Sequence, residues 1–119
     1  MLRIRKIADS HTPANRSAIE EAQAIIRAQF PGMSASDIDK LPDQLDNPFR
    51  HRFVAKLFVA EDARGRVKAV ALLLHDPELA FSYLEVISVA PGGRSGSGIG
   101  GALYDRVREE AQQLGANGL

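Results

Sequence analysis

Apolar residues recur at strand spacing in some parts of the chain and at helical spacing in others. Residues 2–7 largely alternate between apolar and polar side chains, which predicts a first strand near the edge of a sheet. Thr12-Pro13 predicts a helix start, because a hydroxyl can cap the first turn and proline fits the first helical position. Apolar residues then recur at helical spacing from Ala18 to Ile26, and Pro31-Gly32 ends the helix.

A second helical region follows, and prolines limit its length. Ser36 resembles an N-cap with acidic residues in the turn after it, and Pro42 and Pro48 keep the helix short or broken. This region carries four acidic residues on one face: Asp37, Asp39, Asp43 and Asp46. The face has two interpretations, a lip that attracts a cationic amine and a solvated helix stabilised by acids near its start.

From residue 53 the apolar pattern takes the period of strands. Phe53–Ala60 predicts one strand, and Asp62–Gly65 predicts the turn after it. Val67–Leu74 contains almost no polar residue, so we expect a central strand that is buried on both faces. His75–Glu78 predicts the next turn, and Ala80–Val89 predicts the third strand of the group. Because the connections are short, the sequence predicts an antiparallel meander.

The last amphipathic segment predicts a helix that packs on the sheet. Its apolar stripe consists of Ile99, Leu103, Val107, Ala111 and Leu114. Its solvent face consists of Arg106, Arg108, Glu109 and Gln112. Tyr104 also lies on this helix, and we interpret it as a packing residue. The predicted order is β-α-α-β-β-β-α, which makes residues 1–119 a single domain of the α+β class with a mostly antiparallel sheet flanked by helices.

Composition excludes several functions. The chain of 119 residues has 15 basic and 15 acidic residues, so no bulk charge favours nucleic acid or an anionic membrane. It has no cysteine, which excludes disulfides, thiol nucleophiles and thiolate metal sites, and a reducing cytoplasm is the expected location. No signal peptide is evident, and no apolar run approaches the roughly 20 residues that cross a bilayer.

The sequence predicts no metal site. The three histidines, His11, His51 and His75, lie far apart beside turn or cap residues, so we expect surface or capping roles for them.

A glycine-rich segment before the last helix carries the main chemical signal. The β-branched strand that ends at Val89 leads into glycines from Gly92 to Gly101, with one arginine, Arg94, among them. The segment opens directly into a helix, so unpaired backbone N–H groups and the positive pole of the helix converge there. Glycine allows the backbone to come close to a bulky anion. The segment therefore predicts a phosphate site.

Two general phosphate motifs fit this segment poorly. Gly96–Gly101 matches the spacing G-x-G-x-x-G of dinucleotide-binding folds. That motif belongs in the first turn of a parallel βαβ unit, whereas this one follows an antiparallel meander and lacks the acidic residue expected about 20 residues further on. The Walker loop needs a lysine at its end, and no lysine follows Lys68.

The order of elements, together with residues Tyr83–Pro91 and Arg94–Tyr104, resembles the GNAT family of N-acetyltransferases. The resemblance runs from the first strand to the last helix. It implies that an R/Q-x-x-G-x-G/A loop holds the pyrophosphate of acetyl-CoA, with Gly98 and Gly100 in the two glycine positions. Arg94 lies one residue too early for the first position of the motif, so either Arg94 or Ser95 can fill it.

The resemblance also implies a set of residues that contact acetyl-CoA. In the family the strand before the loop splays from its neighbour, and its backbone pairs with the acetyl-pantetheine arm. The implied residues are Ile87, Ser88 and Val89 for the arm and Arg94, Ser95, Gly96, Ser97, Gly98, Ile99 and Gly100 for the pyrophosphate. No metal is implied.

The implied reaction is direct transfer of the acetyl group from acetyl-CoA to a primary amine. A general base must remove a proton, because free lysine-type amines titrate near pH 10.4. Glu85 is the candidate base, and alternation places it on a face with Tyr83, Ile87 and Val89. If that face lines the cleft, desolvation raises the pKa of Glu85. The alternative is an ordinary glutamate that faces solvent and pairs with an arginine.

The sequence leaves the acceptor amine unidentified. In the resembled family the fold continues after this helix with a strand, a helix and two further strands, so the resemblance implies a domain truncated at its C-terminus. A further segment or a second copy of the chain would then complete the sheet, because the last strand exposes its edge. The alternative function is an inactive GNAT-like module that binds CoA or a partner chain without turnover.

Overall fold

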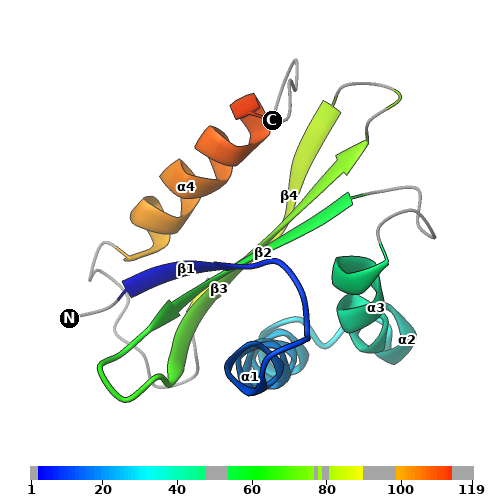
Figure 1. Ribbon diagram of the computed structural model, residues 1–119. Helices are drawn as coiled ribbons and strands as arrows, with labels where there is room; N and C mark the ends of the chain where they lie inside the picture. The colour runs from blue at the N-terminus through cyan, green and yellow to red at the C-terminus, as the bar shows by residue number, and fades with distance from the viewer. Residues whose placement is uncertain (1–2, 48–53, 77, 79–80, 90–98, 114–119) are drawn as a thin grey trace.

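The computed structural model has a four-stranded antiparallel sheet with helices on both faces (Figure 1). It describes residues 3–47, 54–76, 78, 81–89 and 99–113, with only the backbone of residues 81–89, 99 and 100. Along the chain the elements are β1 (Arg3–Ile7), α1 (Pro13–Gln29), α2 (Ala35–Asp39), α3 (Leu41–Asp46), β2 (Val54–Glu61), β3 (Val67–Asp76), β4 (Phe81–Val89) and α4 (Ile99–Gln113). This order confirms the prediction, with the second helical region divided into α2 and α3. Pro42 lies in the first turn of α3, where its missing N–H costs no helical hydrogen bond.

The strands follow one another across the sheet in chain order, β1-β2-β3-β4, and every pairing is antiparallel. The predicted meander and the edge position of the first strand are therefore confirmed. At one point the prediction is wrong: His75 and Asp76 continue β3 opposite Ser82 and Phe81 instead of forming a turn. Both side chains are buried. Pairing with β4 extends the strand by two residues beyond its apolar run.

Caps define the ends of α1. The Thr12 hydroxyl accepts a hydrogen bond from the N–H of Asn15 at 3.1 Å, as an N-cap does, and Pro13 occupies the first turn. The helix ends at Gln29, and the N–H of Phe30 still donates to the carbonyl of Ile26 at 2.8 Å. The start and end predicted from Thr12-Pro13 and Pro31-Gly32 are confirmed.

The cap of α2 lies two residues before the predicted one. The hydroxyl of Ser34, whose backbone is extended, accepts from the N–H of Asp37 at 3.2 Å. Ser36 already belongs to the helix, because its carbonyl accepts from the N–H of Lys40 at 3.1 Å. Both serines precede an acidic residue, and only backbone conformation distinguishes the cap from the helical position.

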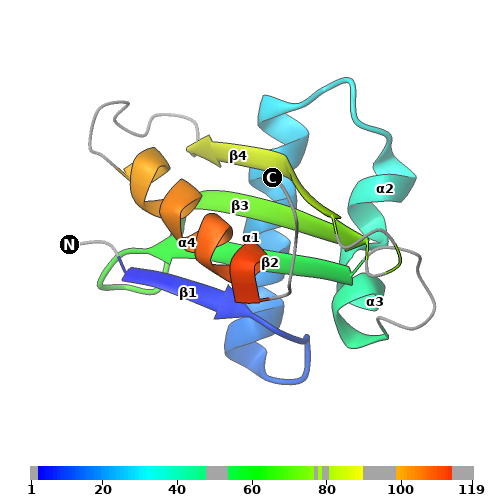
Figure 2. The ribbon, with the colours of Figure 1, turned by 90° about the horizontal axis from the view of Figure 1, so that it is seen from above.

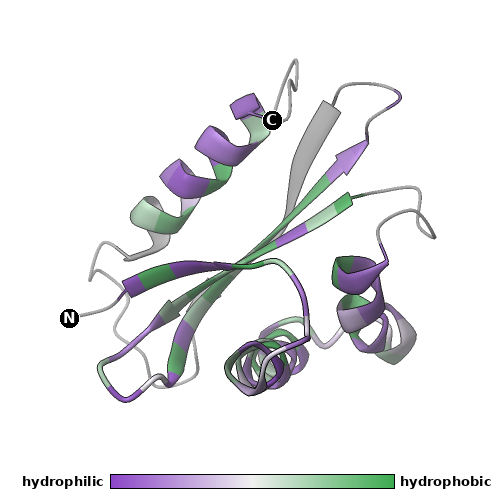
Figure 3. Cartoon of the chain, viewed as in Figure 1, coloured by the Kyte–Doolittle hydropathy of each residue, from purple (hydrophilic) through white to green (hydrophobic). Residues whose placement is uncertain are grey.

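β3 is buried on both faces and separates two apolar cores, as predicted for the central strand. The core on the side of α1 (the α1-side core) is covered by α1, α2 and α3, and its sheet residues are Ile7, Ala55, Leu57, Val59, Val67, Val70, Leu72 and Leu74. The core on the side of α4 (the α4-side core) consists of Phe58, Ala60, Ala69, Ala71, Leu73, Leu103, Val107 and Ala111. Figure 3 shows the apolar strand centres and the polar outer side of α4.

α4 packs on a sheet face that is made mostly of small side chains. Ala60, Ala69 and Ala71 have no exposed surface, and they leave room for the apolar stripe of α4 to approach the sheet closely. Leu103 and Val107 are also fully buried in this contact. The described part of the predicted stripe, which ends at Ala111, is confirmed; Leu114 lies outside the described residues.

Two polar contacts border the α4-side core. The ammonium of Lys6 on β1 lies 3.2 Å from Glu110 Oε1, and the guanidinium of Arg106 lies 5.4 Å from the centre of the Phe58 ring. The prediction that Tyr104 is a packing residue is wrong, because the residue is 39% exposed and faces Arg108 at the surface.

No helix in the described part of the chain is both long and apolar enough to span a bilayer.

Leu103→Ala tests the packing of α4. Because Leu103 is fully buried in the α4-side core and its removal leaves a cavity, we expect a loss of about 2–5 kcal/mol in the free energy of unfolding, measured by urea denaturation. Tyr104→Ala is the neighbouring control on the exposed face and costs less than about 1 kcal/mol. Equal losses for the two variants would contradict this packing.

Candidate functional site

β4 ends and α4 begins at the same end of the sheet (Figures 1 and 2). Val89, the last residue of β4, lies opposite Ala69, near the start of β3. The loop that joins the two elements spans residues 90–98, which lie outside the described residues. The predicted pyrophosphate contacts on this loop therefore stay predictions: Arg94, Ser95, Gly96, Ser97 and Gly98.

The first turn of α4 has the features of an anion site. It starts at Ile99 and Gly100, and it contains no acidic residue that would neutralise the positive pole of the helix. The N–H groups of a first turn have no partner within the helix. A Cβ added at Gly101 would meet no atom within 4 Å among the described residues.

A β-bulge interrupts β4 at Glu85. Val86 lies opposite Leu72, and Leu84 lies opposite Leu73, the next residue of β3. Glu85 is therefore the extra residue of β4 that has no counterpart in the register. Bulges occur frequently beside active sites, where they change the direction of a side chain and interrupt pairing. The bulge coincides with the residue that was chosen from the sequence as the candidate base, and the role of Glu85 as a base stays a prediction.

The bulge changes which residues of β4 share a face. Ile87 lies opposite Ala71 of the α4-side core, and Tyr83 lies opposite Leu74 of the α1-side core. Because opposite residues of an antiparallel pair share a face, the expected common face of Tyr83 and Ile87 is wrong. Strict alternation does not continue through the extra residue.

The three residues predicted to pair with the pantetheine arm lie at the end of β4. Ile87, Ser88 and Val89 face Ala71, Val70 and Ala69 in the register. Within the described ranges, β4 pairs with β3 alone. The other edge of β4 therefore presents N–H and C=O groups without a described strand partner. An extended ligand could pair with this edge as an added strand does.

The acidic face on α2 and α3 is occupied by contacts within the protein. The carboxylates have these partners: Asp37 lies 3.2 Å from Lys40, Asp39 pairs with Arg27, Asp43 accepts from Asn47 at 2.8 Å, and Asp46 accepts from the N–H of Ser10 at 2.7 Å. Hydrogen bonding from Ser34 and Lys40 lowers the pKa of Asp37 below its usual value of 3.8. These partners favour the interpretation as a stabilised helical surface.

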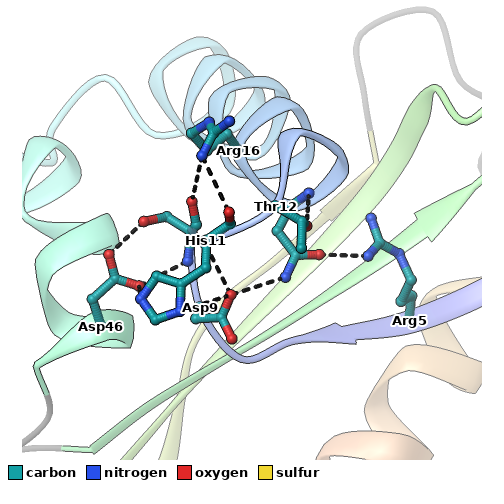
Figure 4. Close-up of polar contacts among 8 residues, drawn as sticks. Arg5, Asp9, His11, Thr12, Arg16 and Asp46 are labelled. Carbon is teal, nitrogen blue, oxygen red and sulfur yellow. Dashed lines mark hydrogen bonds and ion pairs between the residues drawn. The ribbon is translucent and has the colours of Figure 1, made fainter.

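A polar network joins the loop after β1 to α3, and sequence reasoning missed it (Figure 4). Both the N–H and the hydroxyl of Ser10 donate to the carboxylate of Asp46. His11 lies beside the same carboxylate, with Nε2 3.8 Å from Asp46 Oδ1, and its Nδ1 lies 3.7 Å from Asp9 Oδ1. The polar run before Thr12-Pro13 was the available sequence signal. The contact between residues 10 and 46 could not be read from it.

Arg5 connects the same region to the sheet. Its guanidinium donates to both oxygens of Glu61 on β2, at 2.8 and 3.2 Å, and to Asn15 on α1 at 2.6 Å. Glu61 is only 5% exposed. This bidentate pair fixes β1 and the start of α1 against β2.

The histidines do not converge. His11 is exposed, as expected, but His75 is buried in β3, which corrects the expectation of a surface position. His51 lies outside the described residues. Among the residues that the structure describes, no group of three or more His, Cys, Asp or Glu side chains could hold a metal ion.

The sequence matches no protein-family model and no curated protein. Its structure is similar to that of Tetrahymena GCN5, with a TM-score of 0.76 and 16% identity over 95% of this chain and 65% of that chain. It is also similar to the catalytic domain of Tetrahymena GCN5 histone acetyltransferase in complex with coenzyme A (TM-score 0.71, 17% identity, 97% and 64% of the two chains). A third similar structure is an acetyltransferase of the GNAT family from Staphylococcus aureus Mu50 (TM-score 0.64, 16% identity, 95% and 67%).

These similarities show that the chain has the fold of GNAT acetyltransferases, which confirms the predicted fold class and the resemblance in fold. At identities below 20% in these three structures, they show the fold alone. The chain spans about two thirds of the length of the three chains.

Asp46→Ala tests the network between the loop after β1 and α3. Removing the acceptor leaves the N–H and hydroxyl of Ser10 without their partner, so we expect a loss of about 1–3 kcal/mol in the free energy of unfolding, measured by urea denaturation. Asp39→Ala removes an exposed carboxylate from the same acidic face, and its loss stays below about 1 kcal/mol. Equal losses in the free energy of unfolding for the two variants would show that the network does not stabilise the fold.

Proposed function

We propose that this protein is an N-acetyltransferase that transfers an acetyl group from acetyl-CoA directly to a primary amine. The observation that carries the proposal is the geometry of β4. The strand has a bulge at Glu85 and an edge without a described strand partner, and it ends at the same end of the sheet at which α4 begins. The similarity to a GCN5 catalytic domain in complex with coenzyme A supports it.

Backbone groups hold acetyl-CoA in this proposal. The N–H groups of Gly98 and Gly100 and the positive start of α4 bind the pyrophosphate, and Arg94 or Ser95 completes the loop. The pantetheine arm lies along the edge of residues 87–89 as an added strand. This places the thioester further back along β4, toward Glu85.

Glu85 acts as the general base. It accepts a proton from the acceptor ammonium, directly or through water, and the neutral nitrogen then attacks the thioester carbonyl carbon. The tetrahedral intermediate collapses by breaking the C–S bond, and the second proton that the nitrogen loses neutralises the departing CoA thiolate. The products are the acetylated amine and CoA. A further segment or a second copy that adds a strand to β4 would form the other wall of the cleft.

Gly98→Glu tests the pyrophosphate site. A carboxylate in place of the phosphate repels the ligand, and we expect the affinity for acetyl-CoA, measured by isothermal titration calorimetry, to fall at least about 100-fold. Gly32→Glu is the matched control, because the same charge enters a position where an added Cβ meets no atom within 4 Å. Circular dichroism confirms folding of both variants. Unchanged binding by Gly98→Glu would show that the site is misplaced.

Glu85→Gln tests the base. We expect kcat/KM to fall about 100- to 10,000-fold at neutral pH, with the affinity for acetyl-CoA retained. The deficit shrinks as the pH approaches about 10, because more of the amine is then neutral without a base. The assay follows CoA thiol release with a lysine peptide, a polyamine and an aminoglycoside as probes.

Glu20→Gln, an exposed change on α1, is the control and leaves the rate unchanged. An equal deficit at all pH values would rule out a role for Glu85 in proton removal. Acetyl-CoA binding without thiol release for any probe would favour a module that binds without turnover.

A further inference from the structure

β1 forms the edge of the sheet that the proposed transfer does not use. The strands lie in the order β1-β2-β3-β4, so β1 and β4 are at opposite edges (Figure 2). Within the described ranges, β1 pairs with β2 alone. Its outer edge therefore presents backbone N–H and C=O groups without a described strand partner. An extended chain can pair with such an edge as an added strand.

The charge of β1 determines which chain can join this edge. Three of its five residues are basic, Arg3, Arg5 and Lys6, and none is acidic. If β1 of a second copy paired with this edge, basic side chains would lie close together across the pair, and like charges in that position are destabilising. An acidic strand meets no such repulsion. The edge therefore favours an acidic partner over another copy of this chain.

An open hollow of about 440 Å³ lies at the start of β1, beside the turn between β2 and β3. Its lining residues are Arg3, Glu61, Asp62, Ala63, Arg64 and Gly65. Arg3 lies opposite Glu61, and Arg5, two residues further along β1, lies opposite Val59 of the α1-side core. The hollow is therefore on the face of the sheet that carries α1. A strand added to β1 would pass beside it.

The two carboxylates of the hollow already have partners in the protein. Glu61 accepts the bidentate hydrogen bonds of Arg5, at 2.8 and 3.2 Å. Asp62 Oδ1 accepts from the backbone N–H groups of Arg64 and Arg66 at 2.9 and 3.0 Å. The hydrogen bond from the Arg66 N–H lowers the pKa of Asp62 below its usual value of 3.8. Both carboxylates thus hold the protein's own donors.

The two guanidinium groups of the hollow are less engaged. Arg3 lies 3.7 Å from Glu61 Oε1, an oxygen that already accepts from Arg5 at 2.8 Å, and 77% of the Arg3 side chain is exposed. Arg64 is exposed, and its guanidinium has no hydrogen bond or ion pair with any residue that the structure describes. The hollow therefore offers two cationic groups to a ligand, directly beside the edge of β1.

We propose that the edge of β1 and this hollow bind an extended acidic segment of a partner protein. The backbone of the segment adds a strand to β1, and its carboxylates contact Arg3 and Arg64. Alternate residues of a strand lie on one face, so acidic residues at every second position bring their carboxylates to the face of the hollow. Guanidinium groups bind carboxylates through paired hydrogen bonds. The inference does not depend on acetyl-CoA, because β4 is at the other edge of the sheet.

The test measures the fluorescence anisotropy of a labelled peptide with the full chain. The peptide has about six residues, as an ordinary strand has, and threonine alternates with glutamate. In one comparison peptide glutamine replaces every glutamate, and in another proline replaces a central threonine and removes its N–H. We expect the glutamate peptide to bind at least about tenfold more tightly than either at low ionic strength. The difference from the glutamine peptide narrows as salt is added.

Arg3→Ala and Arg64→Ala identify the contacts of the carboxylates. We expect each variant to bind the glutamate peptide about threefold to tenfold more weakly and the glutamine peptide unchanged. Arg27→Ala is the matched control, since it removes an exposed arginine of α1 that pairs with Asp39, and it changes neither affinity. Circular dichroism confirms that the three variants are folded.

Several results would overturn the inference. Equal binding of the glutamate and glutamine peptides would remove the recognition of acidic residues, and equal binding of the proline peptide would remove the added strand. Absence of binding by all three peptides would reject the surface as a whole. A concentration-dependent dimer that excludes the glutamate peptide would assign the edge to a second copy. None of these results affects the proposed acetyl transfer, which the acetyl-CoA titrations test separately.

Discussion

The close packing of α4 on the alanine-rich face of the sheet determines where the helix begins, and the proposed anion site depends on that position. Leu103 and Val107 have no exposed surface, and the small side chains beneath them allow only a narrow range of helix positions. Because the helix axis is fixed, its first turn is fixed beside the end of β4. Nine residues, 90–98, then join the two elements. Preorganised backbone donors bind an anion without the entropic cost of ordering flexible side chains, so a rigid helix start is a better anchor than a lysine on a mobile loop.

The proposed site also depends on the pairing of β4 with β3. This pairing differs between the two parts of β4. Over Val86–Val89 the register with β3 is regular, and this stretch can present a straight edge to an extended ligand. At Glu85 the register shifts by one residue, and the pairing with β3 is interrupted. One strand therefore offers a regular binding edge and, directly next to it, a position that the ladder does not constrain. A reacting group benefits from such a position, since its orientation need not follow the alternation of the sheet.

The sequence predicted features that depend on neighbouring residues and missed those that depend on distant ones. The Thr12 cap, the proline in the first turn of α1 and the apolar run of β3 are local signals, and the structure has all three. The bulge at Glu85 is a relation between two strands, so one strand's pattern cannot reveal it. His75 and Asp76 look like turn residues because they are polar, but pairing with β4 keeps them in the sheet. The link between Ser10 and Asp46 joins residues 36 positions apart.

An even balance of 15 basic and 15 acidic residues does not prevent a protein from binding a polyanion, because the arrangement of charges matters more than their sum. Here the β2–β3 turn and the start of α4 lie at one end of the sheet. Glu85 lies four residues before the end of β4, which is roughly 13 Å along an extended strand. This separation exceeds the Debye length of about 8 Å at physiological ionic strength. In the proposed transfer, the length of β4 thus separates the anion site at the start of α4 from the candidate base.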